Sequence, residues 1–405
     1  MSQKKLSVEF HTLLSRLRAV PFRLARRLIS GLLALLLSGP NALHAGALDP
    51  LENSALDRLN VEKSLFMDIA LAGNRLVAVG ERGHILYSDD AGSHWRQSEV
   101  PVSVSLTSVH FVSDLQGWAV GHDGVILNSM DGGASWQLHF DGFALNQLLL
   151  ESTERAFLEA EQAFESGELD ERTFEDLSFA LEDLQHMTGI GATRPLMKIW
   201  FADARSGFAL GAYNTLLRTA DGGETWQSHG AKLDNPQNFH LNAITASANG
   251  DLFIVGESGL VLRSSNQGEA WERLDFPNRG SLFGVLASRE GWIVAFGLRG
   301  SLFLSGDNGD SWERIDTHTN ASIFGGSLFA SGAGAALATQ DGELLFFDND
   351  RKRIGRKSPD RGYPLLALEH VPRSDDDVLR FAVAGVKGIQ IVEVGFDPFD
   401  MEAGK

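Results

Sequence analysis

The chain has 405 residues, of which 43% are apolar and 22% charged, so it is long enough to bury a large core. It contains no cysteine, which excludes disulfides, thiolate catalysis, cysteine-ligated zinc and a cysteine-linked lipid anchor. Beyond residue 47 it holds 28 Lys/Arg against 52 Asp/Glu, and this net charge of −24 gives no electrostatic reason to bind nucleic acid or an anionic membrane face.

Residues 1–47 are predicted to be a secretory signal peptide. They carry seven Lys/Arg and one acid, then the apolar run LISGLLALLLSG (28–39) and the small-residue motif AGA (45–47). This order is typical of export signals, and the apolar run is too short to span a bilayer comfortably. We expect cleavage after Ala47, or after Ala45, and a periplasmic protein. The alternative is an uncleaved membrane anchor, because the basic region is long.

One eight-residue pattern recurs through the rest of the chain. Its copies are SDDAGSHW (88–95), SMDGGASW (129–136), TADGGETW (219–226), SSNQGEAW (264–271) and SGDNGDSW (305–312). Each follows an apolar run, a glycine turn and an alternating run, as in GWAVGHDGVILNS (117–129), and this order is typical of a β-hairpin. The repeat length of roughly 40–45 residues predicts one four-stranded propeller blade per unit.

Two further units lack the closing peptide but keep the hairpin, AALATQDGELLFFD (335–348) and RFAVAGVKGIQIVEV (380–394). The chain is therefore predicted to be an all-β, seven-bladed β-propeller over residues 48–394, with a tail at 395–405. The last unit ends after its third strand. We expect a segment within 50–63 to supply the fourth strand and close the ring, which would remove an exposed sheet edge.

The repeated peptide is predicted to be a structural turn. Ser or Thr ends the third strand, the acid two places on accepts backbone hydrogen bonds across the turn, and glycine allows positive φ. Tryptophan then returns on the fourth strand and covers apolar surface. The residues assigned this structural role are Asp90, Trp95, Asp131, Trp136, Asp221, Trp226, Asn266, Trp271, Asp307 and Trp312. Asn266 replaces the acid in the fourth copy and can make the same turn.

The pattern S-x-D-x-G-x-x-W resembles the Asp-box, or BNR repeat, of sialidase-type β-propellers. The longer pattern of LGAYNTLLRTADGGETW (210–226) and VGHDGVILNSMDGGASW (120–136) resembles the photosystem II stability and assembly factor family. This resemblance covers about 64–394. It implies an exported seven-bladed scaffold that assists assembly of membrane proteins and has no catalytic residues. Family members tend to place arginine before the Ser/Thr of the box, which Arg218 and Arg263 match and Tyr87, Asn128 and Leu304 do not.

A glycan-active or glycan-binding propeller is the alternative reading. A sialidase needs three clustered arginines, a tyrosine nucleophile with a glutamate partner, and an acid/base aspartate. The three tyrosines, Tyr87, Tyr213 and Tyr363, and the arginines do not follow that arrangement, although other glycosidases need only two carboxylates. Phosphate-binding loops, nucleophile elbows and histidine-rich metal spacings are also missing from the sequence. We expect no enzymatic activity, no catalytic residue, no cofactor and no metal.

The turns between second and third strands are the predicted partner-binding surface. In a meander they lie on the face opposite the repeated peptide, and they differ from blade to blade. The candidates are Arg82, His122, Tyr213, Arg299 and Lys387, against the alternative of ordinary polar turns. The expected partner is a membrane or envelope protein complex.

Two segments interrupt the repeat. Residues 143–190 hold twelve acids and two arginines, with apolar residues near helical spacing and a turn at SGELD (166–170). They predict a two-helix hairpin between blades two and three, either packed on the propeller or projecting as a docking arm. The basic run RKRIGRKSPDRG (351–362) is predicted to be a solvated loop, with contact to anionic lipid headgroups or an acidic partner as the second possibility.

Overall fold

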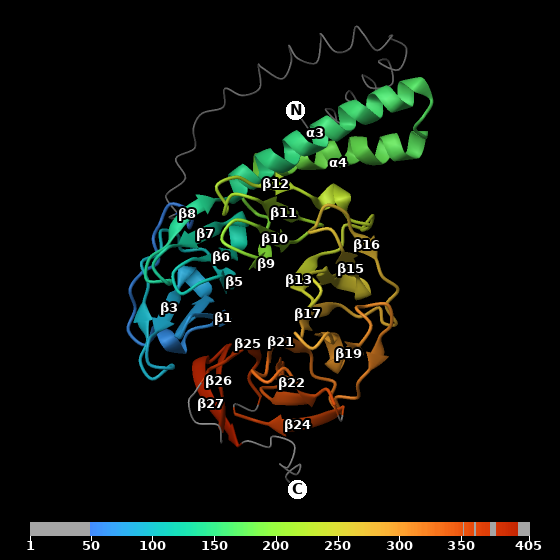
Figure 1. Cartoon of the computed structure of the whole chain (residues 1–405). Helices are drawn as coiled ribbons and strands as arrows, with labels where there is room; N and C mark the ends of the chain where they lie inside the picture. Colours follow the sequence, from blue (N-terminus) through green and yellow to red (C-terminus); the bar gives the residue numbers. More distant parts are fainter. Residues whose placement is uncertain (1–48, 351, 360–361, 373–377, 396–405) are drawn as a thin grey trace, which may run out of the picture. The chain divides into compact units, whose positions relative to one another are not determined.

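A computed structural model describes residues 49–350, 352–359, 362–372 and 378–395. The predicted signal peptide and most of the predicted tail lie outside the described residues. Seven antiparallel sheets stand around a central axis, and two helices project from one side (Figure 1). The predicted all-β, seven-bladed propeller with a helical-hairpin insertion is therefore confirmed.

Each of the first six blades is a four-stranded meander whose strands run outward from the axis in chain order. The first three blades comprise β1 (Phe66–Ala72), β2 (Arg75–Gly80), β3 (Ile85–Ser88) and β4 (Arg96–Gln97); β5 (Leu106–Phe111), β6 (Gly117–Gly121), β7 (Ile126–Ser129) and β8 (Gln137–Phe140); and β9 (Leu196–Phe201), β10 (Gly207–Gly211), β11 (Leu216–Thr219) and β12 (Gln227–Ser228).

The remaining blades follow the same order, and the seventh sheet has three strands within the described residues. They comprise β13 (Leu241–Ala246), β14 (Leu252–Gly256), β15 (Val261–Ser264) and β16 (Glu272–Arg273); β17 (Leu282–Ala287), β18 (Ile293–Gly297), β19 (Leu302–Ser305) and β20 (Glu313–Arg314); β21 (Ile323–Leu328), β22 (Gly334–Thr339), β23 (Leu344–Asp348) and β24 (Arg353–Lys357); and β25 (Leu365–His370), β26 (Val378–Gly385) and β27 (Gly388–Gly395).

The core lies between the blades. Each of β6, β10, β14 and β18 is buried along its whole length, since neighbouring blades cover both of its faces. This explains why their sequences are continuous apolar runs instead of alternating ones. Large aromatic side chains fill the space between sheets, as where Trp118 of β6 stacks on Phe201 of β9 with ring centroids 3.5 Å apart.

The repeated peptide forms the same hydrogen-bonded turn in all five copies, which we call the hairpin lock. In blade two, the Ser129 hydroxyl donates to Asp131 Oδ1 (2.9 Å) and accepts from the Gly133 N–H (2.9 Å). Asp131 Oδ1 also accepts from the Ser135 N–H at 2.9 Å. Burial alone would raise the pKa of Asp131, but hydrogen bonds from Ser135 and Ser129 outweigh it and lower the pKa. Asn266 makes the corresponding bonds to Ser264 and Ala270 in blade four.

The lock also joins successive blades, which the sequence did not indicate. The indole N–H of Trp118 donates to the Gly222 carbonyl in the next blade's lock at 2.9 Å. Arg75 Nη1 donates to the Gly132 carbonyl (3.2 Å) and Arg263 Nη1 to the Asn308 carbonyl (2.8 Å), again one blade onward. Each of these turns therefore presents backbone acceptors to the blade before it.

The predicted ring closure is wrong. The described residues 49–65 contain no strand, only turns and a short helix at Val61–Lys63. Their backbone bonds go to the far side of blade one instead: the Ala55 N–H donates to the Val100 carbonyl, and the Pro50 carbonyl accepts from the Ser103 N–H. The ring closes through side chains, because Phe66 and Ile69 of β1 pack in one core cluster with Ala382 and Ala384 of β26.

The predicted arm consists of α3 (Gly142–Ser166) and α4 (Glu171–Ile190). Asp141 caps α3 by accepting from the Ala144 N–H, and Asp170 caps α4 by accepting from the Thr173 N–H. Between them Gly167 adopts φ +80°, which ends α3 in the left-handed conformation expected of a C-terminal glycine.

Acid should destabilise the propeller through the hairpin locks. Hydrogen bonds from Thr225 and Thr219 lower the pKa of Asp221 from 3.8 to about 2, so its stabilisation is complete above 3.8 and is lost as the pH falls through about 2. We expect the Asp221→Asn variant to fold well, because Asn266 forms the same turn in blade four. The variant should lose less stability than the wild type between about pH 5 and pH 2. Urea unfolding across this range measures the effect, with Asp221→Ala as the destabilised control. Equal acid sensitivity of wild type and Asp221→Asn would contradict the assignment.

Candidate functional site

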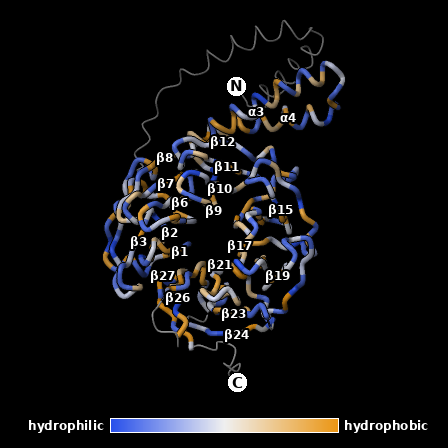
Figure 2. Tube along the Cα trace, viewed as in Figure 1, coloured by the Kyte–Doolittle hydropathy of each residue, from blue (hydrophilic) through white to orange (hydrophobic). Residues whose placement is uncertain are grey.

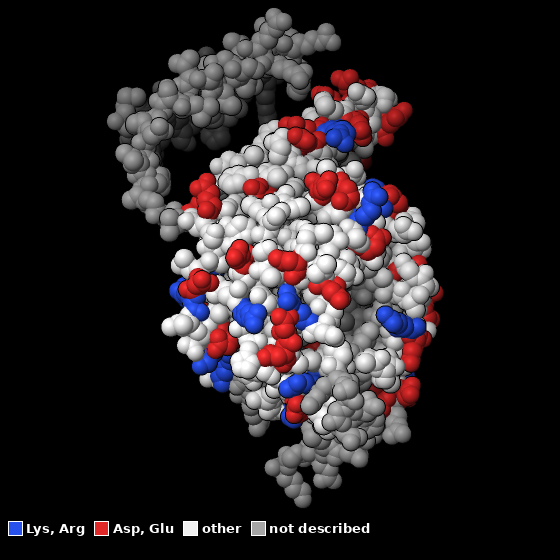
Figure 3. Space-filling model, turned by 60° about the vertical axis from the view of Figure 1, so that its left-hand side comes forward, with Lys and Arg blue, Asp and Glu red and all other residues white. Residues whose placement is uncertain are grey.

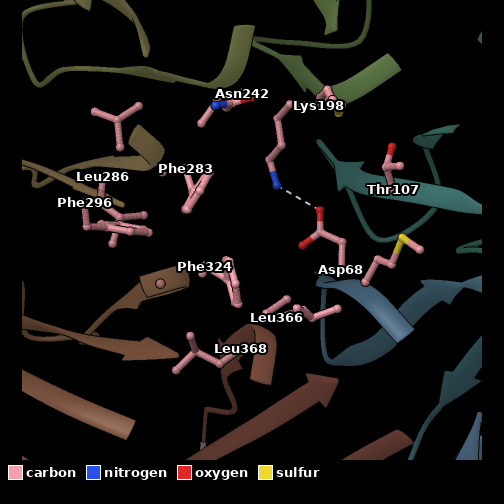
Figure 4. A pocket seen from close by; sticks show the side chains of 18 of the residues that line it. Asp68, Thr107, Lys198, Asn242, Phe283, Leu286, Phe296, Phe324, Leu366 and Leu368 are labelled. Carbon is pink, nitrogen blue, oxygen red and sulfur yellow. Dashed lines mark hydrogen bonds and ion pairs between the residues drawn. The ribbon is translucent and has the colours of Figure 1, made fainter. Parts of the chain in front are cut away.

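The innermost strands of the seven blades stand around a channel along the propeller axis (Figure 1), and Figure 4 shows the side chains that line it. It encloses a cavity of about 180 Å³ that is lined largely by Met, Phe, Leu, Ile and Gly. Phe283 of β17 and Phe324 of β21 lie 5.5 Å apart on one side, measured between ring centroids. The lining contains one carboxylate, Asp68, and one ammonium, Lys198, and neither arginine nor tyrosine. It therefore lacks the clustered arginines and the tyrosine that sialidase chemistry needs.

Asp68 organises the polar part of the channel. Its Oδ2 accepts from Lys198 Nζ at 2.8 Å, from the Ser108 hydroxyl at 2.8 Å and from the Val109 N–H at 3.1 Å. These donors come from β9 and β5, so one carboxylate of β1 joins three successive blades. The side chain of Asp68 is 12% exposed and that of Lys198 34%, which leaves the ammonium partly open to the channel (Figure 4).

A second acid lies in the channel wall. Glu369 of β25 accepts from the Ser327 hydroxyl of β21 at 3.2 Å. Burial, with a smaller contribution from the negative charge of Asp68, raises the pKa of Glu369 to about 7. On β5, the imidazole of His110 donates through Nε2 to the Phe201 carbonyl at 3.0 Å, and burial lowers its pKa to about 4. With these pKa values, both groups are neutral between about pH 4 and about pH 7.

The five predicted partner-binding residues occupy equivalent turns of different blades. Each such turn is bonded to the residue entering the innermost strand of its own blade; for example, the Glu81 N–H donates to the Leu65 carbonyl. The hairpin locks join the third strand to the fourth, at the opposite ends of the strands. The structure does not bring the five candidates together: Arg82, His122, Tyr213, Arg299 and Lys387 stand on blades one, two, three, five and seven.

Three of the candidates have distinct surroundings. Tyr213, 57% exposed, lies against the guanidinium of Arg194 (5.3 Å to the ring centroid) and the imidazole of His240 (4.8 Å between centroids). The ammonium of Lys387 lies 3.5 Å from the centre of the Tyr363 ring. Arg299 lines a surface pocket together with two further arginines, Arg279 and Arg314, which sequence reasoning missed because they stand in a connecting segment and on an outer strand.

The arm packs on the propeller through the first half of α3, including Leu148 and Leu149. Leu145 and Asn146 in the first turns of α3 are buried, whereas none of the residues of α4 is buried. Farther out the helices pack on each other through Phe174, which lies 4.8 Å from Phe164 and 5.3 Å from Phe157. The two-helix insertion therefore projects from the propeller, which is one of the two arrangements expected from the sequence (Figure 1).

Apolar and acidic side chains share the outer surface of the arm. Leu158 is 53% exposed and Phe179 is 66% exposed. Hydrophilic and hydrophobic positions alternate along both helices (Figure 2), and acidic side chains gather over the arm (Figure 3). Among the described residues, no helix is both long enough and apolar enough to cross a membrane.

The basic run is not a free loop. Residues Arg353–Lys357 form β24, the outer strand of blade six. Arg356 Nη1 donates to Glu343 Oε2 at 3.0 Å, Lys352 pairs with Glu313, and Lys357 donates to the Glu393 carbonyl. The positive charges that can be described are thus engaged within the propeller. Among the described residues no cluster of three or more His, Asp or Glu side chains is arranged to hold a metal ion.

These features define the chain as a seven-bladed β-propeller. Solved propellers of low sequence identity share the fold. The structure described as YCF48 bound to D1 peptide superposes with a TM-score of 0.57 at 16% identity, over 85% of this chain and 99% of that one. The WD40 propeller of Doa1 gives a TM-score of 0.56 at 10% identity, over 85% and 96%.

The sequence comparisons narrow the class. The family model for the photosynthesis system II assembly factor YCF48 matches residues 89–147 and 184–281. The photosystem II assembly lipoprotein Ycf48 of Synechococcus sp. (strain CC9902) is 31% identical over 78 residues, which is 19% of this chain and 23% of that protein. The chloroplastic stability/assembly factor HCF136 of Oryza sativa subsp. japonica is 32% identical over 74 residues, 18% of each. The predicted resemblance to photosystem II assembly factors is confirmed, although these alignments span under a quarter of the curated relatives.

The ion pair in the channel should stabilise the ring. Lys198→Met leaves the Asp68 carboxylate poorly compensated, and we expect it to lower the free energy of unfolding by about 1–3 kcal/mol. The double variant Asp68→Asn/Lys198→Met should recover at least half of that loss, as measured by a urea double-mutant cycle. Additive effects of the two single changes would contradict a direct interaction.

Glu369 should make the propeller less stable as the pH rises, which is opposite to the effect expected of Asp221. Its pKa rises from 4.5 in the unfolded chain to about 7, so its stabilisation is present below 4.5 and is lost as the pH rises through about 7. Glu369→Gln should therefore remove part of the fall in stability of the wild type between about pH 5 and pH 8. Thermal unfolding of both proteins over this range is the measurement. Parallel pH profiles would contradict the raised pKa.

Proposed function

We propose that the protein is an exported, non-catalytic scaffold that binds a segment of a membrane or envelope protein while its complex is assembled. The observation that carries this proposal is the likeness to YCF48-type assembly factors. It consists of the match to the family model and of the shared propeller fold. One of those propellers is described as bound to D1 peptide, which makes a peptide segment of a membrane protein the first partner to consider. The predicted signal peptide supports a periplasmic location.

The channel supports a binding role over hydrolysis. Its cavity of about 180 Å³ is below the volume of typical small-molecule pockets, about 300–1,000 Å³. Its carboxylate Asp68 already accepts three hydrogen bonds from groups of the propeller itself. A glycan-processing site would need two carboxylates facing an open cleft, whereas the cavity lining holds Asp68 alone and Glu369 is bonded to Ser327 in the channel wall.

The arm supplies an apolar surface for such a partner. Leu158 and Phe179 lie beyond the part of α3 that packs on the propeller, and acids surround them. Exposed apolar residues with a charged surround are typical of a surface that binds another protein reversibly. The insertion is thus proposed to be a docking arm with apolar contacts at its outer half.

Affinity capture from detergent-solubilised membranes tests the proposal. The tagged chain should retain an integral membrane protein, and we expect Leu158→Ser/Phe179→Ser to reduce its recovery at least about fivefold, since a buried apolar anchor contributes more than about 1 kcal/mol. Leu115→Ser/Met130→Ser is the matched control, because Leu115 (59%) and Met130 (63%) are equally exposed but lie outside the arm.

A shortened arm gives a second test. Residues 157–180 can be replaced by a Gly-Ser turn while the packed base of α3 is kept. Recovery unchanged by both arm variants would remove the arm from the proposal. Failure of the wild-type chain to retain any integral membrane protein would contradict the scaffold function itself.

A further inference from the structure

The arginines that match the family pattern are not available to a partner in this chain. Arg263 Nε pairs with Glu272 at 2.8 Å, and its Nη1 pairs with Asp310 at 2.7 Å. Arg218 pairs with Glu269, which also pairs with Lys232 at 3.1 Å. Both guanidiniums are therefore neutralised by acids of their own or the neighbouring blade. A negatively charged partner would have to bind to other residues.

A different arginine cluster lines a pocket on blade five, which we call the blade-five pocket. It has a volume of about 660 Å³ and is bounded by the segment Pro277–Gly280, the turn at Leu298 and Arg299, strands β19 and β20, and Asn320. Arg279, Arg299 and Arg314 line it, and its lining includes no Asp or Glu. In a chain with net charge −18, three guanidiniums around one cavity without a lining acid mark a local reversal of charge.

None of the three guanidiniums has an ion-pair or hydrogen-bond partner among the residues that the structure describes. All three residues are exposed, and they come from three separate parts of the chain. Three exposed groups of like charge around one cavity raise the local positive potential, which attracts anions. The geometry thus favours a ligand with more than one negative charge.

The pocket is held in shape before any ligand arrives. The turn that carries Arg299 is bonded on both sides, by the Leu298 N–H to the Ser281 carbonyl (2.9 Å) and by the Thr317 hydroxyl to the Gly300 carbonyl (2.8 Å). Asn278 Nδ2 donates to the Ser301 hydroxyl oxygen at 3.1 Å and ties the connecting segment to β19. Binding would therefore order few new groups, which favours affinity.

The floor of the pocket is aromatic. Phe303 and Trp312 line it, and Phe276 packs edge-on against both, with centroid distances of 4.8 and 5.2 Å. Leu298 adds an apolar side chain at the rim, 36% exposed. A free phosphate or a lipid headgroup would use the guanidiniums alone, whereas a peptide that alternates acidic and apolar side chains would use both the arginines and this floor.

We propose that the blade-five pocket binds an acidic peptide segment of a partner protein, through carboxylates on Arg279, Arg299 and Arg314 and an apolar side chain over Phe303 and Trp312. This rests on the proposed scaffold function, because it names the chemistry of the segment that the scaffold would hold. Guanidiniums suit this task, since each can donate two parallel hydrogen bonds to a carboxylate.

Fluorescence anisotropy with synthetic peptides tests the site in the whole processed chain. The probe is a fluorescein-labelled decapeptide of alternating Glu and Leu, compared with the same peptide carrying Gln for Glu. We expect the acidic peptide to bind, and Arg299→Glu/Arg314→Glu to weaken it at least about tenfold, because two charge pairs become repulsive. Arg289→Glu is the matched control: Arg289 is exposed on the same blade, in the turn between β17 and β18 at the opposite end of the strands.

The outcomes separate this inference from the scaffold function. Weaker binding in Arg299→Glu/Arg314→Glu, with Arg289→Glu within about twofold of wild type and all melting temperatures alike, supports the pocket. Equal affinity in wild type and the double variant, equal binding of the Gln peptide, or binding only to vesicles of anionic lipid would overturn it. Capture of a membrane protein that survives the double variant would leave the scaffold function standing while the pocket fails.

Discussion

This propeller depends most on the hydrogen bonds of the Ser or Thr hydroxyl group that ends the third strand of a blade. In blades one to five it donates to an Asp or Asn side chain and accepts from a glycine N–H four residues on, as Thr219 does with Asp221 and Gly223. The chain thereby reverses within a few residues, and the turn's outward carbonyls become acceptors for the preceding blade. A local hydrogen-bond pattern thus fixes both the hairpin and the spacing of the sheets.

Local order of this kind can be read from sequence, and contacts between distant segments cannot. The repeat predicted seven blades, and the acid-rich insertion predicted two helices, because turns, caps and helical spacing are encoded within a few residues. Closure was mispredicted because the backbone bonds of residues 50–55 go to residues 100–103, which no period indicates. Arg299 was identified as a turn residue, but its grouping with Arg279 and Arg314 depends on how blade five meets the connecting segments on either side.

Several cations form ion pairs inside the propeller or between its blades. Lys198 pairs with Asp68 in the channel, Arg263 pairs with Glu272 and Asp310, and Arg356 pairs with Glu343. In a strongly acidic chain this pairing limits repulsion between carboxylates. The blade-five pocket differs, because three guanidiniums line one cavity whose lining includes no acid, and an anionic ligand from outside the chain would supply the missing negative charge.

The seventh blade shows how little a propeller needs in order to close. Its three strands meet blade one through a shared apolar cluster, in which Leu76 and Leu86 pack with Ala367 and Val371. The side chain of Ile391 on β27 lies against Gly92 in the first hairpin lock, so close that a Cβ at that glycine would collide with it. Closure by side-chain packing also uses Val61 of the short helix before β1, and a side chain at Gly92 would require Ile391 to move.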